Sequence, residues 1–318
     1  MDFSADRAAE GIQNNCSCKT DMFYQYRNSP NRQIAIPLHD GHRIVIRTNC
    51  RETDVPFYGL ESLLCLDAEG WKGSIIDAEF FYRKDLPSGR HPLKTGGLTE
   101  IAYSEDWNHI LIAGWKRMPR DPVYYRNYLW QMALVYGCMN SILHGGTAIL
   151  VHCAVLETER GAVLLFGESG MGKSTAFKRW LRDGGKGRSD DMALLDFSRK
   201  DGVFVRRMPT WSACREGRNE WNYPSGEEIP LAGVLALGRS ESGHDEIVPI
   251  RDAQFFAQCY RALFYWFIFV AEALPETMKE RFAGRVRTMT ERLAGMFPSR
   301  ALLTALDGNL TDFLKEML

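Results

Sequence analysis

The sequence predicts an α/β fold, in which a small, mainly β N-terminal region precedes a larger region of strands and helices. Three observations predict it. Short strand-like runs separated by turn residues lie before residue 120, an apolar run without alternation occupies Ala162–Phe166, and an amphipathic helical stretch follows at Lys173–Arg182. A length of 318 residues suits two domains, and we place the boundary at Pro119–Pro122, which gives domains at residues 1–120 and 121–318.

The N-terminal region has the pattern of a small β domain. Gln33–Pro37 and Arg43–Arg47 are strand-like and flank Asp40-Gly41, a strong hairpin-turn signal. Further short strands are expected at Gly73–Tyr82 and His109–Trp115. These elements predict a mainly β N-terminal domain.

The second region begins with a long predicted helix, Val123–His144, in which apolar residues recur at helical spacing and Gly145-Gly146 follows the last turn. Two apolar runs come next, at Ala148–Leu156 and Ala162–Phe166. Because the second run has no alternation, we expect a strand that is covered on both faces of its sheet.

The C-terminal part continues the pattern. Leu231–Leu237 is expected to be a core strand, and the aromatic stripe between Phe255 and Phe267 is expected to lie in the core or between helices. Met278–Met296 and Ala301–Met317 predict two amphipathic helices.

The composition excludes several classes of protein. Lys and Arg total 39 and Asp and Glu total 40, so the net charge of -1 provides no basic face for general nucleic-acid binding. The longest apolar run, Ala262–Ala271, is far shorter than the roughly 20 residues of a membrane-spanning helix. No signal-peptide core and no CxxC pair occur. We expect a cytoplasmic protein with reduced cysteines, in which Cys16 and Cys18 are free thiols or, alternatively, have a metal or redox role.

A glycine-rich segment carries the clearest chemical signal. It is Gly167-Glu168-Ser169-Gly170-Met171-Gly172-Lys173-Ser174, which fits the P-loop pattern GxxxxGK(S/T) and lies between the predicted strand and helix, as this motif requires. Glycines let the backbone turn so that successive N–H groups form a nest for phosphate oxygens, and the helix N-terminus adds positive charge. Lys173 is placed to reach the terminal phosphates of a nucleoside triphosphate, and the Ser174 hydroxyl to ligate Mg²⁺.

Two further features are candidates for the same site. Asp190 and Asp191 precede the apolar run Met192–Leu195, and such a pair suggests one carboxylate for the metal and one for a substrate proton. The alternative is a solvated turn, because a glycine-rich stretch comes just before it. His152 lies fifteen residues before Gly167. The alternative interpretation is a structural core histidine whose ring nitrogens have hydrogen-bond partners.

As a set, His152, the GESGMGKST loop and Ser189-Asp190-Asp191 resemble the bacterial HPr serine kinase/phosphorylase family. That family has a histidine at the same distance before the loop and an (A/S)DD motif at the same distance after it. The resemblance extends over about Leu143–Leu195. It implies a P-loop kinase core with a mixed sheet and helices, related to that of phosphoenolpyruvate carboxykinase.

The resemblance also implies a role for each matching residue. The residues that would hold the ATP phosphates are Gly167, Glu168, Ser169, Gly170, Met171, Gly172, Lys173, Ser174 and Thr175. Lys173 would contact the β- and γ-phosphates, and Ser174 and Asp191 would hold Mg²⁺. Asp190 would accept the proton of an acceptor serine, and His152 would lie beside the acceptor and the phosphate. The division of labour between the two aspartates stays open.

The sequence departs from that family in two places. Thr175 stands where the family has Glu, and Met208–Gly217 does not match its signature segment, although Arg215 or Glu216 could serve the site. HPr as the substrate and the phosphorylase reaction are therefore both in doubt. The closer similarity is to HPr-kinase-like proteins of peptide-modification cassettes, such as the ScmC-like kinase of the SynChlorMet type, whose target is a ribosomally made peptide.

We therefore expect an ATP- and Mg²⁺-dependent kinase that phosphorylates a serine of a peptide or small protein, with the N-terminal domain recognising that acceptor. Two alternatives remain: a P-loop ATPase or nucleotide-dependent switch, and a kinase of free serine or a similar small molecule. Neither nucleic acid nor a membrane is an expected partner. The identity of the acceptor is not determined, and a homo-oligomer is left open.

Overall fold

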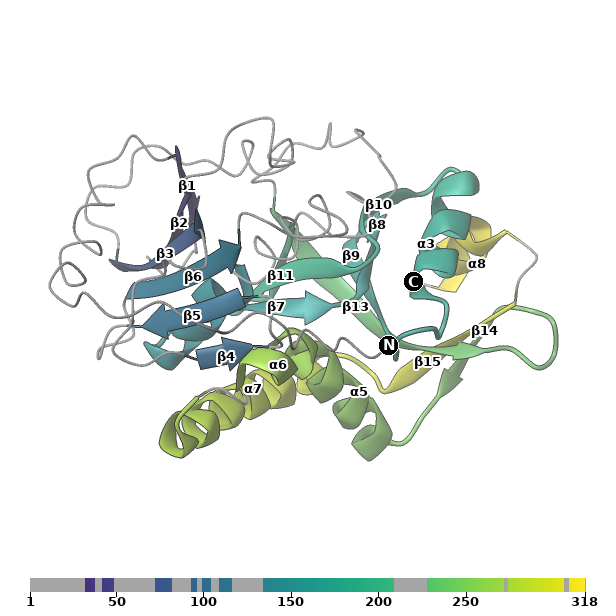
Figure 1. Cartoon of the computed structure of the whole chain (residues 1–318). Coiled ribbons are helices and arrows are strands. Elements are labelled where there is room, and N and C mark those ends of the chain that lie inside the picture. Colours follow the sequence, from purple (N-terminus) through teal and green to yellow (C-terminus); the bar gives the residue numbers. More distant parts are fainter. Residues whose placement is uncertain are drawn as a thin grey trace, which may run out of the picture.

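The computed structural model describes residues 32–37, 42–48, 72–81, 93–95, 99–103, 109–115, 134–208, 228–271, 274–305 and 309–317. These residues form two β-sheets and a set of helices, a mixed α/β architecture (Figure 1). The predicted α/β class with a mixed sheet is thereby confirmed, whereas the kinase core and the separate N-terminal domain stay predictions. No helix in the described ranges has the length and apolar character needed to cross a membrane.

The first sheet contains the N-terminal strands in the order β1-β2-β3-β6-β5-β4. Their bounds are β1 Arg32–Pro37, β2 His42–Thr48, β3 Lys72–Phe81, β4 Leu93–Thr95, β5 Thr99–Tyr103 and β6 His109–Trp115. Strands β1 and β2 are antiparallel, as the Asp40-Gly41 signal predicts, whereas β2, β3 and β6 run parallel. The predicted boundary at Pro119–Pro122 lies outside the described residues, so the division into two domains stays a prediction.

The second sheet has the order β10-β8-β9-β13-β12-β11-β7, and β14 and β15 join it through β13. The bounds are β7 Ala148–His152, β8 Ala154–Thr158, β9 Gly161–Phe166, β10 Lys186–Ser189, β11 Met192–Asp196, β12 Phe204–Arg207, β13 Glu228–Arg239, β14 Glu246–Pro249 and β15 Arg300–Thr304. The predicted run Ala148–Leu156 is interrupted at Cys153. As a result, β7 pairs with β11 and β8 pairs with β9 and β10.

Strand β9 is buried on both faces, as its apolar sequence predicts. Ala162, Leu164 and Phe166 belong to a large core cluster, and Val163 and Leu165 belong to a second, smaller one. Alternate side chains of a strand point to opposite faces, so helices must cover both sides of this sheet.

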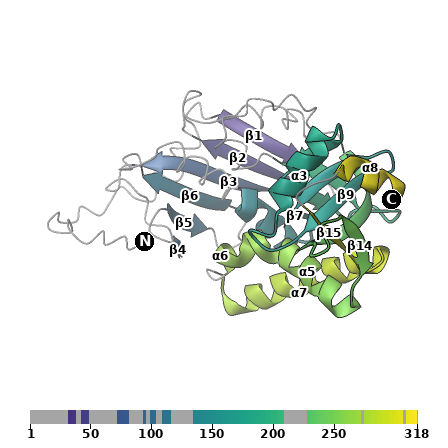
Figure 2. The ribbon, with the colours of Figure 1, turned by 90° about the vertical axis from the view of Figure 1, so that its right-hand side faces the viewer.

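The helices divide between these two cores. They are residues 134–143, α3 Lys173–Arg182, α5 Asp252–Phe264, the 3₁₀ turn η6 Tyr265–Phe267, α6 Ile268–Ala271, α7 Glu276–Met296 and α8 Leu310–Met317. Residues 134–143, α5 and α7 pack in the large cluster, whereas α3 and α8 pack in the small one. Figure 2 shows α3 and α8 on one side of β7, β9 and β15, with α5 and α7 on the other.

Three predictions about helices are tested here. The prediction at Met278–Met296 is confirmed by α7. The single helix predicted at Ala301–Met317 is wrong, because residues 300–304 form β15, parallel to β13, and only α8 is helical. The physical reason is tertiary: Ala301 and Leu302 are buried where they extend the sheet. Of the helix predicted at Val123–His144, the described part is helical over residues 134–143.

Close packing links α3 to strand β10. A Cβ atom at Gly187 would lie 2.3 Å from Cε2 of Phe177 on α3, and Trp180 on the same helix donates a hydrogen bond to the carbonyl of Lys186. Gly187, and Gly185, whose added Cβ would lie 2.3 Å from Trp180, therefore serve close helix–strand packing, whereas Gly184 lies in an exposed turn with a φ of 84°. Asp190 is 6% exposed, so the solvated turn that was the alternative interpretation of the aspartate pair is not observed at that residue.

Candidate functional site

The glycine-rich loop runs from the end of β9 to the start of α3. Gly170 and Gly172 have φ angles of 83° and 99°, a conformation that glycine adopts without strain. At Gly167, an added Cβ would approach Cβ of Leu237 on β13 to 3.3 Å. Both the turn and the close contact with the neighbouring strand thus favour glycine at the fixed positions of the motif.

Lys173 begins helix α3 and is 5% exposed. Its Nζ donates hydrogen bonds to the carbonyl oxygens of Gly167, at 2.9 Å, and Glu168, at 3.2 Å. Burial lowers the pKa of Lys173, and the nearby carboxylate of Asp191 opposes this shift. The ammonium group is therefore held over the first residues of the loop.

The first turn of α3 presents polar groups to the outside. Ser174 and Thr175 are exposed, and Gly172, the N-cap residue, provides no side-chain hydrogen bond to the helix N–H groups. N–H groups of a helix start that lack a side-chain cap can bind an anion, and the helix dipole favours negative charge there. This end of the loop fits phosphate oxygens, with the two hydroxyls beside them.

His152 and Asp191 meet across β7 and β11. The strand register pairs His152 with Met192, and the N–H of Cys153 donates to the carbonyl of Asp191 at 3.2 Å. This brings Nε2 of His152 to 3.4 Å from Oδ1 of Asp191. Burial lowers the pKa of His152, and the hydrogen bond to Asp191 partly offsets that effect. Strand pairing therefore builds an imidazole–carboxylate pair that also acts electrostatically on Lys173.

A side-chain hydroxyl organises the turn that carries the two aspartates. Oγ of Ser189 accepts hydrogen bonds from the N–H groups of Asp191, at 3.3 Å, and Met192, at 3.1 Å, and donates to the carbonyl of Met192 at 2.7 Å. Asp190 is 6% exposed. The turn brings Asp191 into contact with His152, and Asp190 is buried.

A comparison with family models bears on this site. The model described as "SynChlorMet cassette protein ScmC" matches residues 126–311, more than half of the chain. The chain belongs to the ScmC family. A comparison with curated proteins finds no match. The matched range contains His152, the glycine-rich loop and both aspartates.

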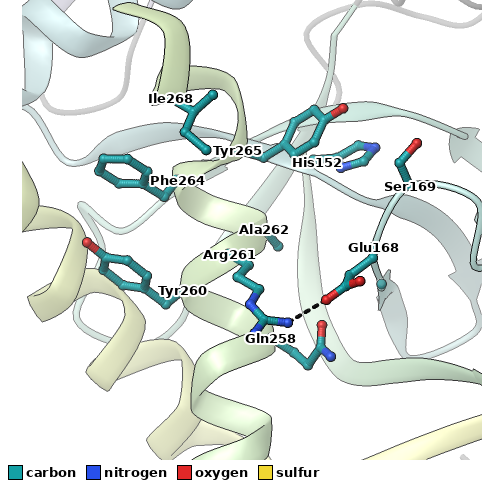
Figure 3. A pocket seen from close by; sticks show the side chains of 11 residues that line it. His152, Glu168, Ser169, Gln258, Tyr260, Arg261, Ala262, Phe264, Tyr265 and Ile268 are labelled. Atoms are coloured by element: carbon teal, nitrogen blue, oxygen red, sulfur yellow. Dashed lines mark hydrogen bonds and ion pairs between the residues drawn. The ribbon is translucent and has the colours of Figure 1, made fainter. Parts of the chain in front are cut away.

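A cavity of about 370 Å³ opens beside the loop of this ScmC-family protein (Figure 3). It extends from Gly167, Glu168 and Ser169 to α5 and η6. The ring of Tyr265 stacks on that of His152, with centroids 3.8 Å apart and planes at 25°. Arg261 forms an ion pair with Glu168 at 2.5 Å. The cavity therefore joins the loop to the aromatic segment that follows α5.

The predicted residues are brought together in part. Lys173, His152 and Asp191 interact electrostatically, and the carbonyl oxygens of Gly167 and Glu168 accept hydrogen bonds from the ammonium group of Lys173. Cys16, Cys18, Arg215 and Glu216 lie outside the described residues. No group of three or more His, Cys, Asp or Glu side chains suited to a metal occurs in the described part of the chain. Mg²⁺ that arrives with nucleotide phosphates needs only one or two protein ligands, so the assignment of Ser174 and Asp191 to Mg²⁺ stays a prediction.

Sequence reasoning did not identify Arg261 or Tyr265 as site residues. Both belong to the stretch from α5 to η6 that was assigned to the core or to a helix interface, and much of that stretch does pack there, including Phe255, Phe267 and Cys259. No sequence signal distinguishes them, because Tyr265 leaves the apolar stripe only where helix α5 changes to a 3₁₀ turn, which the structure shows. Only the tertiary structure brings this segment to His152.

Proposed function

We propose that this protein is an ATP- and Mg²⁺-dependent kinase that transfers the γ-phosphoryl group of ATP to a serine hydroxyl of a peptide, in particular a ribosomally made one. The observation that carries the proposal is the arrangement of three side chains. The ammonium group of Lys173 donates a hydrogen bond to the carbonyl of Gly167 in the loop, and His152 and Asp191 lie 3.4 Å apart. Phosphoryl transfer requires positioning and charge neutralisation more than covalent chemistry, and these groups supply both.

Each residue has a role in this proposal. The loop N–H groups and Lys173 would bind the phosphates, and Ser174 and Asp191 would hold Mg²⁺, which neutralises charge on the phosphate oxygens. The serine oxygen would form a bond to the γ-phosphorus while the bond to the β-phosphate oxygen breaks and ADP leaves. Asp190 would accept the serine proton, with Asp191 as the alternative base. His152 would orient the acceptor side of the site.

Two further observations support a peptide acceptor. The ScmC family is named for a cassette, which suggests a biosynthetic setting, and the set of His152, loop and Ser189-Asp190-Asp191 resembles HPr-kinase-like proteins of peptide-modification cassettes. The paired acidic residues also favour a transferase over a nucleotide-dependent switch, because a switch needs no base for an acceptor.

The test uses the purified full chain with Mg·ATP, serine peptides and the peptide encoded beside its gene. A mass gain of one phosphate on a peptide is the expected result. Asp190→Asn should leave ATP binding intact and slow transfer about 10²- to 10⁴-fold, the usual effect of losing a general base. Release of ADP and free phosphate with every acceptor would support the ATPase alternative instead. Phosphorylation of free serine alone would support the small-molecule alternative.

A further inference from the structure

The cavity beside the glycine-rich loop has an apolar wall that the proposed chemistry does not use. Phe264, Tyr265 and Ile268 line it from the side of α5, η6 and α6 (Figure 3). Among the described residues, the exposed large hydrophobic side chains are Tyr265, Ile268 and Met296, and two of these three border this cavity. Single exposed apolar side chains are ordinary on a protein surface, but several that line one concave site indicate a binding site.

The charged residues of the cavity neutralise each other. Arg261 and Glu168 form an ion pair at 2.5 Å, and their side chains are 60% and 63% exposed. With these two charges paired, the cavity offers no net charge to select a charged side chain. Its lining therefore favours an aliphatic or aromatic occupant.

The cavity lies at the end of the loop where the terminal phosphate is expected. Lys173 points its ammonium group at the carbonyls of Gly167 and Glu168, the first loop residues, and both residues line the cavity. A P-loop lysine reaches the β- and γ-phosphates, so this end faces the acceptor. The exposed hydroxyl of Thr175, which is not assigned to Mg²⁺, lies at the other end of the loop, on the first turn of α3. An occupant of the cavity would therefore contact the acceptor side and not the nucleotide base.

We infer that the cavity holds an aliphatic or aromatic side chain next to the acceptor serine, so that the substrate is a peptide with an apolar residue beside its serine. The inference rests on the proposed kinase function. A cavity of about 370 Å³ is within the ordinary range for small ligands, roughly 300–1,000 Å³, and accepts a large side chain in addition to the serine. Free serine would leave Tyr265 and Ile268 exposed to water.

The experiment compares two variants that place the same charge on different exposed hydrophobic residues. Ile268→Glu puts a carboxylate in the cavity, where Ile268 is 51% exposed, and Met296→Glu puts one on α7, where Met296 is 39% exposed. Neither residue belongs to the proposed catalytic or nucleotide-binding groups. The probes are capped pentapeptides with serine at the first, central or last position and Phe, Leu, Ala, Glu or Lys beside it.

Two readouts are measured. The first is kcat/KM for phosphorylation of each peptide, and the second is the anisotropy of dye-labelled Phe-Ser and Glu-Ser peptides bound to the protein without nucleotide. We expect kcat/KM to be at least about tenfold higher with Phe or Leu beside serine than with Glu, because one apolar group in a pocket contributes about 10- to 200-fold. Ile268→Glu should abolish this preference in both readouts and shift kcat/KM toward the Lys peptides, whereas Met296→Glu should retain the preference.

The outcomes separate the inference from the proposed function. Equal use of all peptides by the wild-type protein, or an unchanged preference in Ile268→Glu, overturns the apolar cavity while the kinase function stands. Phosphorylation of free serine as fast as of any peptide overturns both the apolar cavity and the peptide acceptor, and leaves only phosphoryl transfer to a serine hydroxyl. If the wild-type protein binds Mg·ATP and modifies no probe, the acceptor inference fails but nucleotide binding remains. If it binds no Mg·ATP, the proposed function and the inference fail together.

Discussion

Nε2 of His152 lies 3.4 Å from Oδ1 of Asp191, and this contact joins the end of β7 to the start of β11. His152 is 9% and Asp191 21% exposed at the side chain, so the pair is partly withdrawn from water. Burial disfavours the charged imidazole, whereas the carboxylate favours it. The protonation state of His152 therefore depends directly on Asp191.

Asp191→Asn is expected to lower the pKa of His152 further. The substitution removes a charge that raises this pKa and leaves the burial that lowers it. NMR titration of the imidazole measures the shift. Asp190→Asn is the matched comparison, because it removes a carboxylate from the adjacent position, and it should move the pKa less. An equal shift in both variants would show that Asp191 has no special contact with His152.

The pH dependence of stability should carry a contribution from His152. Its pKa in the folded protein is below the ordinary value of 6.5. Between these two pKa values, the unfolded chain therefore binds more protons than the folded protein does. The contribution is therefore complete above about pH 6.5 and is lost progressively as the pH drops toward the folded pKa. Urea unfolding of the wild type and of His152→Gln is measured between pH 5 and 8. Because glutamine keeps a polar group at this position, the difference between the two free energies of unfolding gives the contribution of His152. A free-energy difference between the two proteins that does not change with pH contradicts the prediction.

Lys173→Ala is expected to weaken Mg·ATP binding. The variant removes the ammonium group that caps the loop, and a hydrogen bond to a charged group contributes about 1.5–3 kcal/mol, or roughly 10- to 150-fold in affinity. Isothermal titration with Mg·ATP measures the affinity. Lys178→Ala, at an exposed position on the same helix, is the control and should bind as the wild type does. Unchanged affinity in Lys173→Ala would show that the loop is not part of the nucleotide site.

Asp245→Ala is expected to destabilise the fold by roughly 3–5 kcal/mol, the usual cost of leaving a buried charge without its partner. Asp245 accepts hydrogen bonds from Arg179 of α3 and from the N–H of Ala305, and the side chains of the ion pair are 5% and 6% exposed. The control is Glu291→Ala, which breaks an exposed i,i+4 pair with Arg287 and should cost only about 0.3–0.5 kcal/mol. Chemical unfolding measures both, and similar losses would contradict the assignment.

Two Gly→Ala substitutions should have opposite signs. Gly187→Ala is expected to destabilise by about 1–3 kcal/mol, because its Cβ would lie 2.3 Å from the ring of Phe177. Gly284→Ala should stabilise by about 0.4–1 kcal/mol, because Gly284 lies inside helix α7 with nothing within 4 Å of an added Cβ. Thermal and urea unfolding give the signs. A stabilising Gly187→Ala would refute the close packing of β10 on α3.

The parts of the fold that local patterns encode could be predicted. The turn signal Asp40-Gly41 predicts the antiparallel β1–β2 pair, and the continuous apolar run Ala162–Phe166 predicts a strand with both faces covered. Helices α3 and α7 follow from their spacing of apolar residues. The run after Ala301 was assigned to a helix from its amphipathic pattern, and this prediction was wrong because residues 300–304 pair with β13, which is far away in the sequence. Local propensity does not contain that contact.

For the site, the glycine-rich loop, its lysine and the candidate histidine and aspartates could be identified from the sequence, because the chemistry of a short loop between a strand and a helix is local. The contact between Asp191 and His152 could not be identified, since it depends on the register of β7 on β11. The same holds for Arg261, which pairs with Glu168 of the loop, and for Tyr265, which stacks on His152, because both lie on a distant helical segment. Such contacts are stabilised by the burial of both core clusters as a whole, and no short stretch of residues encodes them.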